Sequence, residues 1–211
     1  MKKDICAEFQ KLKGRTIIGL TGAAASGKSA VLDRFRKLGA FCVSTDALAK
    51  EVLTSGACYN RILGKFSPRV FLKDGSIDRK VLAEAVFSDK AKRKRLEKIL
   101  HPEILKQTLS LIEKSHEKLI VVEVPLLFEA GLGNCFDFTV CVDAPAKLRK
   151  RRAAGRGWGA GELKARSAAQ LPAGEKAGRA DIVLANGGSL KELKAKVKKI
   201  YDFWKTVKLE K

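Results

Sequence analysis

The chain has 211 residues, of which 45% are hydrophobic and 31% charged, and its formal net charge at pH 7 is +20. This length suits one domain, or one domain with insertions, and it is sufficient to bury a substantial core. No apolar run is long enough to cross a membrane, and residues 1–15 lack the apolar region of a signal peptide. We therefore expect a cytoplasmic protein with no membrane partner.

The excess of basic residues raises the question of nucleic-acid binding. The lysines are spread along the chain, however, and between residues 190 and 204 they alternate with apolar residues at helical spacing. These apolar residues are Leu190, Leu193, Val197, Ile200 and Trp204. The pattern is typical of a solvated helix face, so we expect no nucleic-acid partner. Part of the charge can instead attract small anionic substrates.

The cysteines indicate neither a metal site nor a disulfide framework. They are Cys6, Cys42, Cys58, Cys135 and Cys141. Their number is odd, and the sequence contains no C-x-x-C pair or Cys/His cluster, which argues against both kinds of site. We expect most of them to be buried as small hydrophobic side chains.

In chain order, residues 1–15 read as a polar extension, and the strongest motif follows it. Thr16–Leu20 is predicted to be a short buried strand, the sequence GAAASGKS fills positions 22–29, and residues 30–38 form an amphipathic helix. The eight residues fit G-x-x-x-x-G-K-[ST], and a strand before and a helix after are the context that this phosphate-binding loop requires. The alternative is a chance match in an alanine-rich loop.

A loop of this kind turns its backbone N–H groups inward and lies at the positive end of the following helix, so it binds the phosphates of a nucleotide. Lys28 can reach the β- and γ-phosphates, and the Ser29 hydroxyl can bind Mg²⁺. The residues predicted to bind the nucleotide here are Gly22, Ala23, Ala24, Ala25, Ser26, Gly27, Lys28, Ser29 and Ala30.

The rest of the chain alternates strands and helices. We predict a strand at 40–43, a helix at 47–53, a mostly helical and polar stretch from 56 to about 118, strands at 119–122 and 138–142, a basic helix at 146–154, a glycine-rich segment at 155–161, a strand at 182–184 and a final helix. This alternation predicts a parallel α/β sheet, with 56–118 as a helical insertion between two of its strands. Ligands of such sheets lie beyond the C-terminal ends of the strands, where Asp46, Glu123, Asp143 and Asn186 fall.

Two carboxylates at these strand ends suggest phosphoryl transfer. Asp46 can accept the proton of an acceptor hydroxyl, or it can cap the helix that begins at Ala47. Glu123 follows an apolar strand and can hold Mg²⁺ through water, or it can pair with a surface lysine. A GTPase is disfavoured because no N-K-x-D motif is present.

The basic stretch at 147–156 supplies cations that can stabilise charge developing on a γ-phosphate. The glycines that follow suit a mobile lid that closes on ATP. The alternative is a basic helix followed by a flexible loop that is compatible with RNA binding. We favour the lid because enzymes that transfer phosphate from ATP exclude water.

Together these segments resemble the dephospho-CoA kinase family, over nearly the whole chain from Ile17 to about Trp204. The shared pieces, in the family's order, are the phosphate loop, LGA at 38–40 with DALAK at 46–50, DGSIDRKVL at 74–82 followed by VF at 86–87, HP at 101–102, VPLLFE at 124–129, and Gln170, Lys176, Ala180-Asp181 and Asn186 with 188–190. Each piece is weak alone, but their order and spacing make the resemblance specific.

The resemblance implies an α/β fold with a three-layer P-loop NTPase-type parallel sheet, a helical substrate-domain insertion and a lid. It implies a single kinase unit over 1–211, whose nucleotide-binding core comprises 16–55 with 119–154 and 177–211. Residues 56–118 would bind the CoA substrate, and 155–176 would form the lid. With ATP and Mg²⁺ as cofactors, the implied reaction phosphorylates the ribose 3′-hydroxyl of dephospho-CoA, the final step of coenzyme A synthesis, in a monomer or weak homo-oligomer.

The resemblance also implies roles for individual residues. Asp46, Lys28, Arg152 and Arg156 would be catalytic, with Asp46 as the base. Asp46, Arg79, His101 and Glu129 would contact the substrate, Asn186 would contact the nucleotide, and Ser29 and Glu123 would hold the metal.

Several positions depart from the family pattern. Ala23 and Ala25 replace glycines, and their methyl groups restrict positive φ. Ser44 replaces the first acid of a D-x-D, Glu123 replaces an aspartate, and the lid is one residue shorter, which leaves the assignment of Arg152 and Arg156 open. Two alternatives therefore remain: another small-metabolite or nucleoside P-loop kinase, and a basic, nucleotide-switched nucleic-acid-binding module.

Overall fold

A computed structural model describes residues 2–12 and 14–207 of the chain. The chain divides into two compact units, one formed by residues up to Ser44 together with those from Leu111 onward, and the other by Thr45–Ser110. Each unit has its own packed interior, and they are described in turn.

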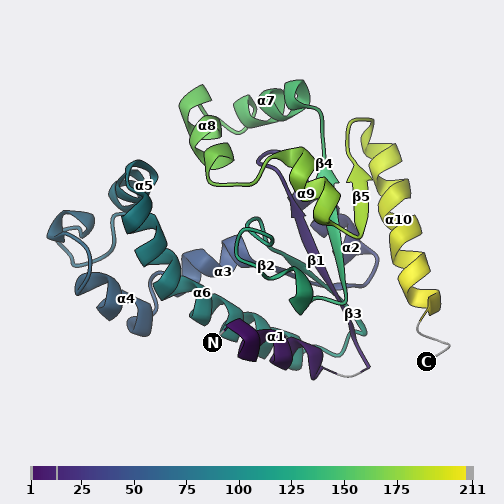
Figure 1. Ribbon diagram of the computed structural model, residues 1–211, viewed down its shortest axis with the longest axis horizontal. Helices are drawn as coiled ribbons and strands as arrows, with labels where there is room; N and C mark the ends of the chain where they lie inside the picture. Colours follow the sequence, from purple (N-terminus) through teal and green to yellow (C-terminus); the bar gives the residue numbers. More distant parts are fainter. Residues whose placement is uncertain (1, 13, 208–211) are drawn as a thin grey trace. The chain divides into compact units, whose positions relative to one another are not determined.

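The first unit is built on a parallel sheet of five strands in the order β2-β3-β1-β4-β5 (Figure 1). The strands are β1 (Thr16–Gly22), β2 (Phe41–Ser44), β3 (Leu119–Glu123), β4 (Phe138–Asp143) and β5 (Ile182–Ala185). Every residue of the central strand β1 is buried. The predicted parallel α/β sheet is thus confirmed, and its strands lie within two residues of their predicted bounds.

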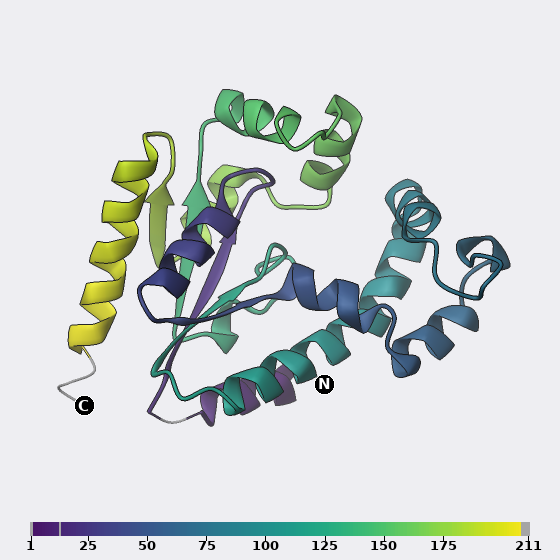
Figure 2. The same cartoon turned by 180° about the vertical axis from the view of Figure 1, so that it is seen from behind.

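Alternate residues of β1 face the two sides of the sheet. Ile18 and Leu20 join a core with α2 (Lys28–Lys37) and α10 (Leu190–Val207). A Cβ at Gly19 would instead collide with Leu127 and Phe136 on the other side. The helix α9 (Ala173–Arg179) packs against β1 and β4 there, and the two ribbon views show α2 and α9 on opposite faces (Figures 1 and 2). The sheet is therefore the middle of three layers.

The final helix buries the apolar stripe predicted for it, with one exception. Leu193, Val197 and Trp204 are buried against the sheet, and Phe138 stacks on Trp204 with ring centroids 3.8 Å apart. Leu190 is exposed, because it is the first residue of α10 and precedes the buried stretch.

The N-terminal segment differs from the polar extension that was predicted. Residues Lys2–Gln10 form the helix α1, and Phe9 is only 3% exposed. Its ring centroid lies 5.6 Å from that of Phe136, and a disulfide joins Cys6 to Cys135, at the end of the short helix η2 (Gly133–Cys135). The expectation of no disulfide thus does not hold for this pair, because only tertiary folding brings together cysteines 129 residues apart.

The other cysteines are free thiols, of which Cys58 and Cys141 are buried as expected and Cys42 is partly buried. Burial raises the pKa of the Cys141 thiol to about 11 and that of Cys42 to about 12. These thiols therefore stay protonated at neutral pH and behave as small apolar side chains.

The second unit is helical, in agreement with the predicted polar helical stretch. It contains α3 (Thr45–Val52), α4 (Gly56–Leu63), the short helix η1 (Pro68–Val70), α5 (Arg79–Ser88) and most of α6 (Lys90–Glu113). Asp78 caps α5 by accepting hydrogen bonds from the backbone N–H groups of Lys80 (2.9 Å) and Val81 (3.1 Å). The Tyr59 hydroxyl donates to the backbone oxygen of Gly75 at 2.7 Å and holds the turn before that cap.

Between β4 and α9 the chain forms α7 (Ala146–Ala154), at its predicted position, and α8 (Ala160–Ala168). The second of these helices was not predicted, since it begins within the glycine-rich segment. Among the helices of residues 2–12 and 14–207, none combines the length and the apolar character that crossing a membrane requires.

Candidate active site

The phosphate loop comprises residues 23–27, between the end of β1 and the start of α2. Gly22 and Gly27 adopt φ values of 148° and 103°, which glycine tolerates and other residues rarely do. A Cβ at Gly27 would collide with the side-chain nitrogen of Asn186. Gly27 is the N-cap of α2 and has no side chain that could accept hydrogen bonds from the first turn. The backbone N–H groups of that turn can therefore face a ligand, as in phosphate-binding loops.

The two alanine departures behave differently. Ala25 has φ 59°, the one positive φ of a non-glycine residue in the part of the chain that the structure describes. The φ of Ala23 is not positive. The left-handed region costs an alanine on the order of 1–2 kcal/mol. The loop therefore accepts both methyl groups, but the conformation at Ala25 must be stabilised by surrounding contacts.

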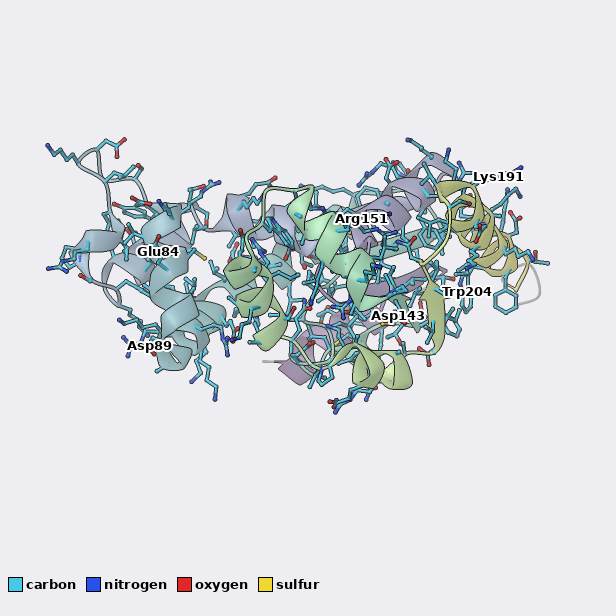
Figure 3. The ribbon with its side chains drawn as sticks, turned by 90° about the horizontal axis from the view of Figure 1, so that it is seen from above. Glu84, Asp89, Asp143, Arg151, Lys191 and Trp204 are labelled. Carbon is cyan, nitrogen blue, oxygen red and sulfur yellow. A yellow bond between two sulfur atoms is a disulfide. The ribbon has the colours of Figure 1, made fainter. Side chains whose placement is uncertain are left out.

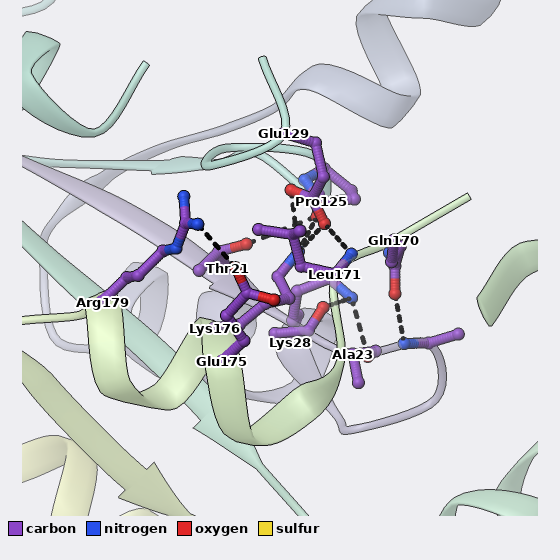
Figure 4. Close-up of polar contacts among 12 residues, drawn as sticks. Thr21, Ala23, Lys28, Pro125, Glu129, Gln170, Leu171, Glu175, Lys176 and Arg179 are labelled. Carbon is purple, nitrogen blue, oxygen red and sulfur yellow. Dashed lines mark hydrogen bonds and ion pairs between the residues drawn. The ribbon is translucent and has the colours of Figure 1, made fainter. Parts of the chain in front are cut away.

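Lys28 folds back over the loop. Its ammonium donates to the backbone oxygens of Gly22 at 3.1 Å and Ala23 at 3.2 Å (Figure 4). This places a positive charge beside the loop backbone, and the reach of Lys28 to the nucleotide phosphates stays a prediction.

Arg152 and Asn186 converge on the loop from α7 and from the end of β5. Arg152 donates to the backbone oxygen of Ser26 (2.9 Å) and to the backbone and side-chain oxygens of Asn186 (3.1 and 3.3 Å). Asn186 also donates through its side chain to Ser26 O (2.8 Å) and is only 4% exposed. Burial, and then the charges of Arg151 and Arg156, lower the pKa of Arg152.

Several other cations of this region face solvent. Arg151 of α7 and Lys191 of α10 are both exposed (Figure 3). Arg156 is exposed as well, and its guanidinium lies 5.6 Å from the centre of the Trp158 ring, which Arg166 covers at 4.3 Å. Of the two predicted lid arginines, the structure thus brings Arg152 to the phosphate loop and places Arg156 against Trp158.

The predicted metal ligands lie at the start of α2 and the end of β3. Glu123 is 5% exposed and accepts a hydrogen bond from the Ser44 hydroxyl at 3.1 Å. Its burial fits a site within the fold better than a surface ion pair. Among the described residues no group of three or more His, Cys, Asp or Glu side chains could hold a metal. A hydroxyl and one carboxylate suit Mg²⁺, which takes few protein ligands and shares its other positions with water and phosphate.

Glu129, predicted to contact substrate, uses both carboxylate oxygens within the protein. They accept from the Lys176 ammonium at 2.9 and 3.2 Å, and one of them also accepts from the backbone N–H of Leu171 at 2.7 Å (Figure 4). The Lys176 side chain is 0% exposed, and its ammonium also donates to the backbone oxygen of Pro125 at 2.6 Å.

Three predicted residues belong to the helical unit. Asp46 is exposed and lies in the first turn of α3, which begins at Thr45, so it is not the N-cap that the alternative interpretation required. Arg79 is the first residue of α5 and donates to the backbone oxygen of Lys50 at 3.3 Å. His101 is partly buried within α6, which continues through Pro102.

Two residues next to the loop received no role from the sequence. Gln170 accepts a hydrogen bond through its side-chain oxygen from the backbone N–H of Ala24 at 2.9 Å, and Lys176 is the buried cation already described. Both belong to the family-like pattern at the C-terminal end. Neither the contact across 146 residues nor the burial of a lysine is visible in the local sequence.

Known proteins match the chain over most of its length. The family model for dephospho-CoA kinase matches residues 16–192. A curated dephospho-CoA kinase of Bacillus licheniformis is 37% identical over 196 residues, which cover 90% of this chain and 98% of the relative.

Two solved structures are also similar. The protein TT1252 from Thermus thermophilus has a TM-score of 0.79 and 36% identity, covering 89% of this chain and 97% of its own. A dephospho-CoA kinase from Campylobacter jejuni has a TM-score of 0.63 and 28% identity, covering 88% and 95%. The family match begins at the first residue of β1, so α1 lies outside it.

Proposed function

Because the chain belongs to the dephospho-CoA kinase family, we propose that it transfers the γ-phosphate of ATP to the ribose 3′-hydroxyl of dephospho-CoA and so produces coenzyme A. Membership of a kinase family implies the use of ATP, generally with Mg²⁺. The observation that carries the proposal for this chain is the phosphate loop on which Lys28, Arg152 and Asn186 converge.

In this proposal Lys28 and the loop amides other than that of Ala24, which donates to Gln170, hold the phosphates of ATP. The Ser29 hydroxyl and Glu123 would hold Mg²⁺, Glu123 through water. A bound Mg²⁺ neutralises charge on the phosphate oxygens and helps to align them. Arg152 keeps the end of the loop in place, and Arg156 supplies positive charge from the lid when it closes. Asn186 acts on the nucleotide indirectly, through the loop. Its side-chain N–H already donates to the backbone oxygen of Ser26, and its side-chain oxygen already accepts from Arg152.

The acceptor is activated by Asp46 in this proposal. Asp46 follows Ser44, the last residue of β2, by two positions in the chain, and ligands of parallel sheets bind beyond the C-terminal ends of the strands. Its carboxylate accepts the proton of the 3′-hydroxyl while that oxygen forms its bond to the γ-phosphorus. The bond between this phosphorus and the β–γ bridging oxygen breaks, and ADP leaves with the electron pair.

We assign recognition of the CoA substrate to the helical unit, with Arg79 and His101 as the residues that contact it. Both belong to the helical unit, and both side chains carry N–H groups that can donate to an anionic substrate. Glu129 is the weakest of the predicted substrate contacts, because both of its oxygens already bind Lys176. We place the reaction in the cytoplasm, in a monomer or weak homo-oligomer that needs no nucleic acid.

The test is the release of ADP from Mg-ATP by the purified protein, with dephospho-CoA or with adenosine as acceptor. We expect dephospho-CoA, but not adenosine, to stimulate the release of ADP strongly, with coenzyme A identified as the product by mass spectrometry. Replacing Asp46 by Asn should lower turnover about a hundredfold or more while Mg-ATP binding changes little, because the base acts on the acceptor.

Binding of Mg-ATP without stimulation by dephospho-CoA would refute this acceptor. A wider panel of nucleosides and small metabolites would then test the alternative kinases. Binding to random oligonucleotides, with a steep dependence on salt, would support the nucleic-acid alternative.

A further inference from the structure

Gln170 links the lid segment to the phosphate loop. It lies two residues after the last residue of α8, and its side-chain oxygen accepts the backbone N–H of Ala24 at 2.9 Å (Figure 4). Ala24 is only 6% exposed, and through this bond its N–H has an acceptor within the protein. The side chain that provides it comes from a segment 146 residues away in the sequence.

The segment that carries Gln170 is itself fixed at two points. The N–H of Leu171 donates to Glu129, and the ammonium of Lys176 donates to Glu129 and to the backbone oxygen of Pro125. Pro125 O also accepts from the Thr21 hydroxyl at 3.4 Å, next to the start of the loop. Residues 170–176 are therefore held against the chain that follows β3.

Because Lys176 is buried, its ammonium depends on these contacts. A charged ammonium without access to water is tolerated only when it is paired and its donors are used. Lys176 meets this condition with two carboxylate oxygens and one backbone oxygen, at 2.9, 3.2 and 2.6 Å. Such a pair costs desolvation and contributes little net stability, but its contacts hold the attached segment in one position.

We propose that Gln170 is a positioning residue that sets the conformation of the phosphate loop, and that the Glu129–Lys176 ion pair holds Gln170 in place for this role. The hydrogen bond fixes the N–H of Ala24 directly before Ala25, the residue that adopts φ 59° without being glycine. It thereby stabilises the backbone where the sequence lacks the glycine that would adopt this conformation readily. Because Gln170 lies within the predicted lid segment 155–176, just after α8, the position of that segment and the geometry of the loop are coupled.

The inference rests on the proposed use of ATP but not on the identity of the acceptor. Its first test is therefore the affinity for Mg-ATP, measured by calorimetry with no acceptor present. Gln170→Met keeps the length of the side chain and removes the acceptor. We expect the dissociation constant to rise about tenfold while the protein remains folded at the assay temperature. Ser167→Ala, at an exposed position one turn earlier, is the matched control and should change nothing.

The second test separates positioning from a purely structural role. In Glu129→Leu/Lys176→Met, an apolar pair of similar size replaces the ions, which keeps the interior packed and removes the acceptor for Leu171 N–H. We expect a loss of Mg-ATP affinity like that of Gln170→Met. Adding Gln170→Met to this double variant should cause no further loss, since both changes act through the same contact.

Near-normal binding by Gln170→Met, within about twofold of the wild type, would overturn the inference, even if its melting temperature fell. Losses that multiply in the triple variant would overturn the role of the ion pair. A wild-type protein that binds Mg-ATP but ignores dephospho-CoA would contradict the proposed acceptor and leave these tests intact. A wild-type protein that does not bind Mg-ATP would contradict both proposals.

Discussion

Arg152 and Asn186 donate to the same atom, the backbone oxygen of Ser26, at 2.9 and 2.8 Å. The two residues come from different elements and also bind one another, through Arg152 and the Asn186 side-chain oxygen at 3.3 Å. A single carbonyl of the phosphate loop is thus held by a cation and a neutral amide. This arrangement fixes the loop just before Gly27 and Lys28.

Replacing Asn186 by Asp should test this attachment. The carboxylate keeps the acceptor for Arg152 but loses the donor to Ser26 O, so two oxygens face each other in a buried place. We expect the protein to lose about 1–3 kcal/mol of stability and the KM for ATP to rise severalfold. Chemical denaturation and steady-state kinetics measure the two effects. Asn60→Asp, at an exposed position of α4, is the control, and equal behaviour of the two variants would contradict the prediction.

Gly27→Ala should abolish nucleotide binding. The new Cβ would collide with the Asn186 side chain, and φ 103° is unfavourable for alanine. The matched control is Gly161→Ala in α8, where an added Cβ meets no atom within 4 Å and φ is not positive. We expect calorimetry to detect Mg-ATP binding by the control and none by Gly27→Ala. Binding of wild-type strength by Gly27→Ala would show that the Asn186 side chain can move without consequence.

The Cys6–Cys135 bond should stabilise the protein without taking part in catalysis. It joins α1, outside the family match, to η2 and closes a loop of 129 residues. Such a cross-link is worth on the order of 2–5 kcal/mol. We expect Cys6→Ser, or reduction of the wild type, to lower the melting temperature by several degrees and leave the KM for ATP unchanged. A reductant should have no effect on Cys6→Ser, and a wild-type melting temperature that is insensitive to reductant would contradict the prediction.

The sheet and the phosphate loop could be predicted because their signals are local. Buried parallel strands read as apolar runs, as at residues 119–122, and the loop has a motif with its own flanking strand and helix. Asp46 and Glu123 were proposed as site residues because they are polar residues at strand ends, and Lys28 was proposed from the loop motif. The structure of these elements is determined mainly by residues that are adjacent in the sequence.

The features that escaped prediction depend on contacts between distant segments. The helix at residues 2–10 packs through Phe9 on Phe136 and is joined through Cys6 to Cys135, and neither of these distant partners can be read from the neighbouring sequence. The burial of Lys176 depends on Glu129, 47 residues earlier. Lysine is almost always exposed unless it is paired, so a sequence pattern favours the surface for such a residue.

Ser44→Asp restores the carboxylate that the family pattern has at this position and should change the dependence on Mg²⁺. Ser44 and Glu123 are paired residues at the ends of β2 and β3, and their side chains are hydrogen-bonded at 3.1 Å. Two carboxylates there would repel each other without a cation and attract Mg²⁺ more strongly than one. We expect the Mg²⁺ concentration for half-maximal turnover to fall severalfold and the metal-free protein to melt at a lower temperature. Ser44→Asn, which has the same shape without the charge, separates the electrostatic effect from a steric one. If both variants titrate with Mg²⁺ alike, Glu123 does not lie close enough to the metal to share it with residue 44.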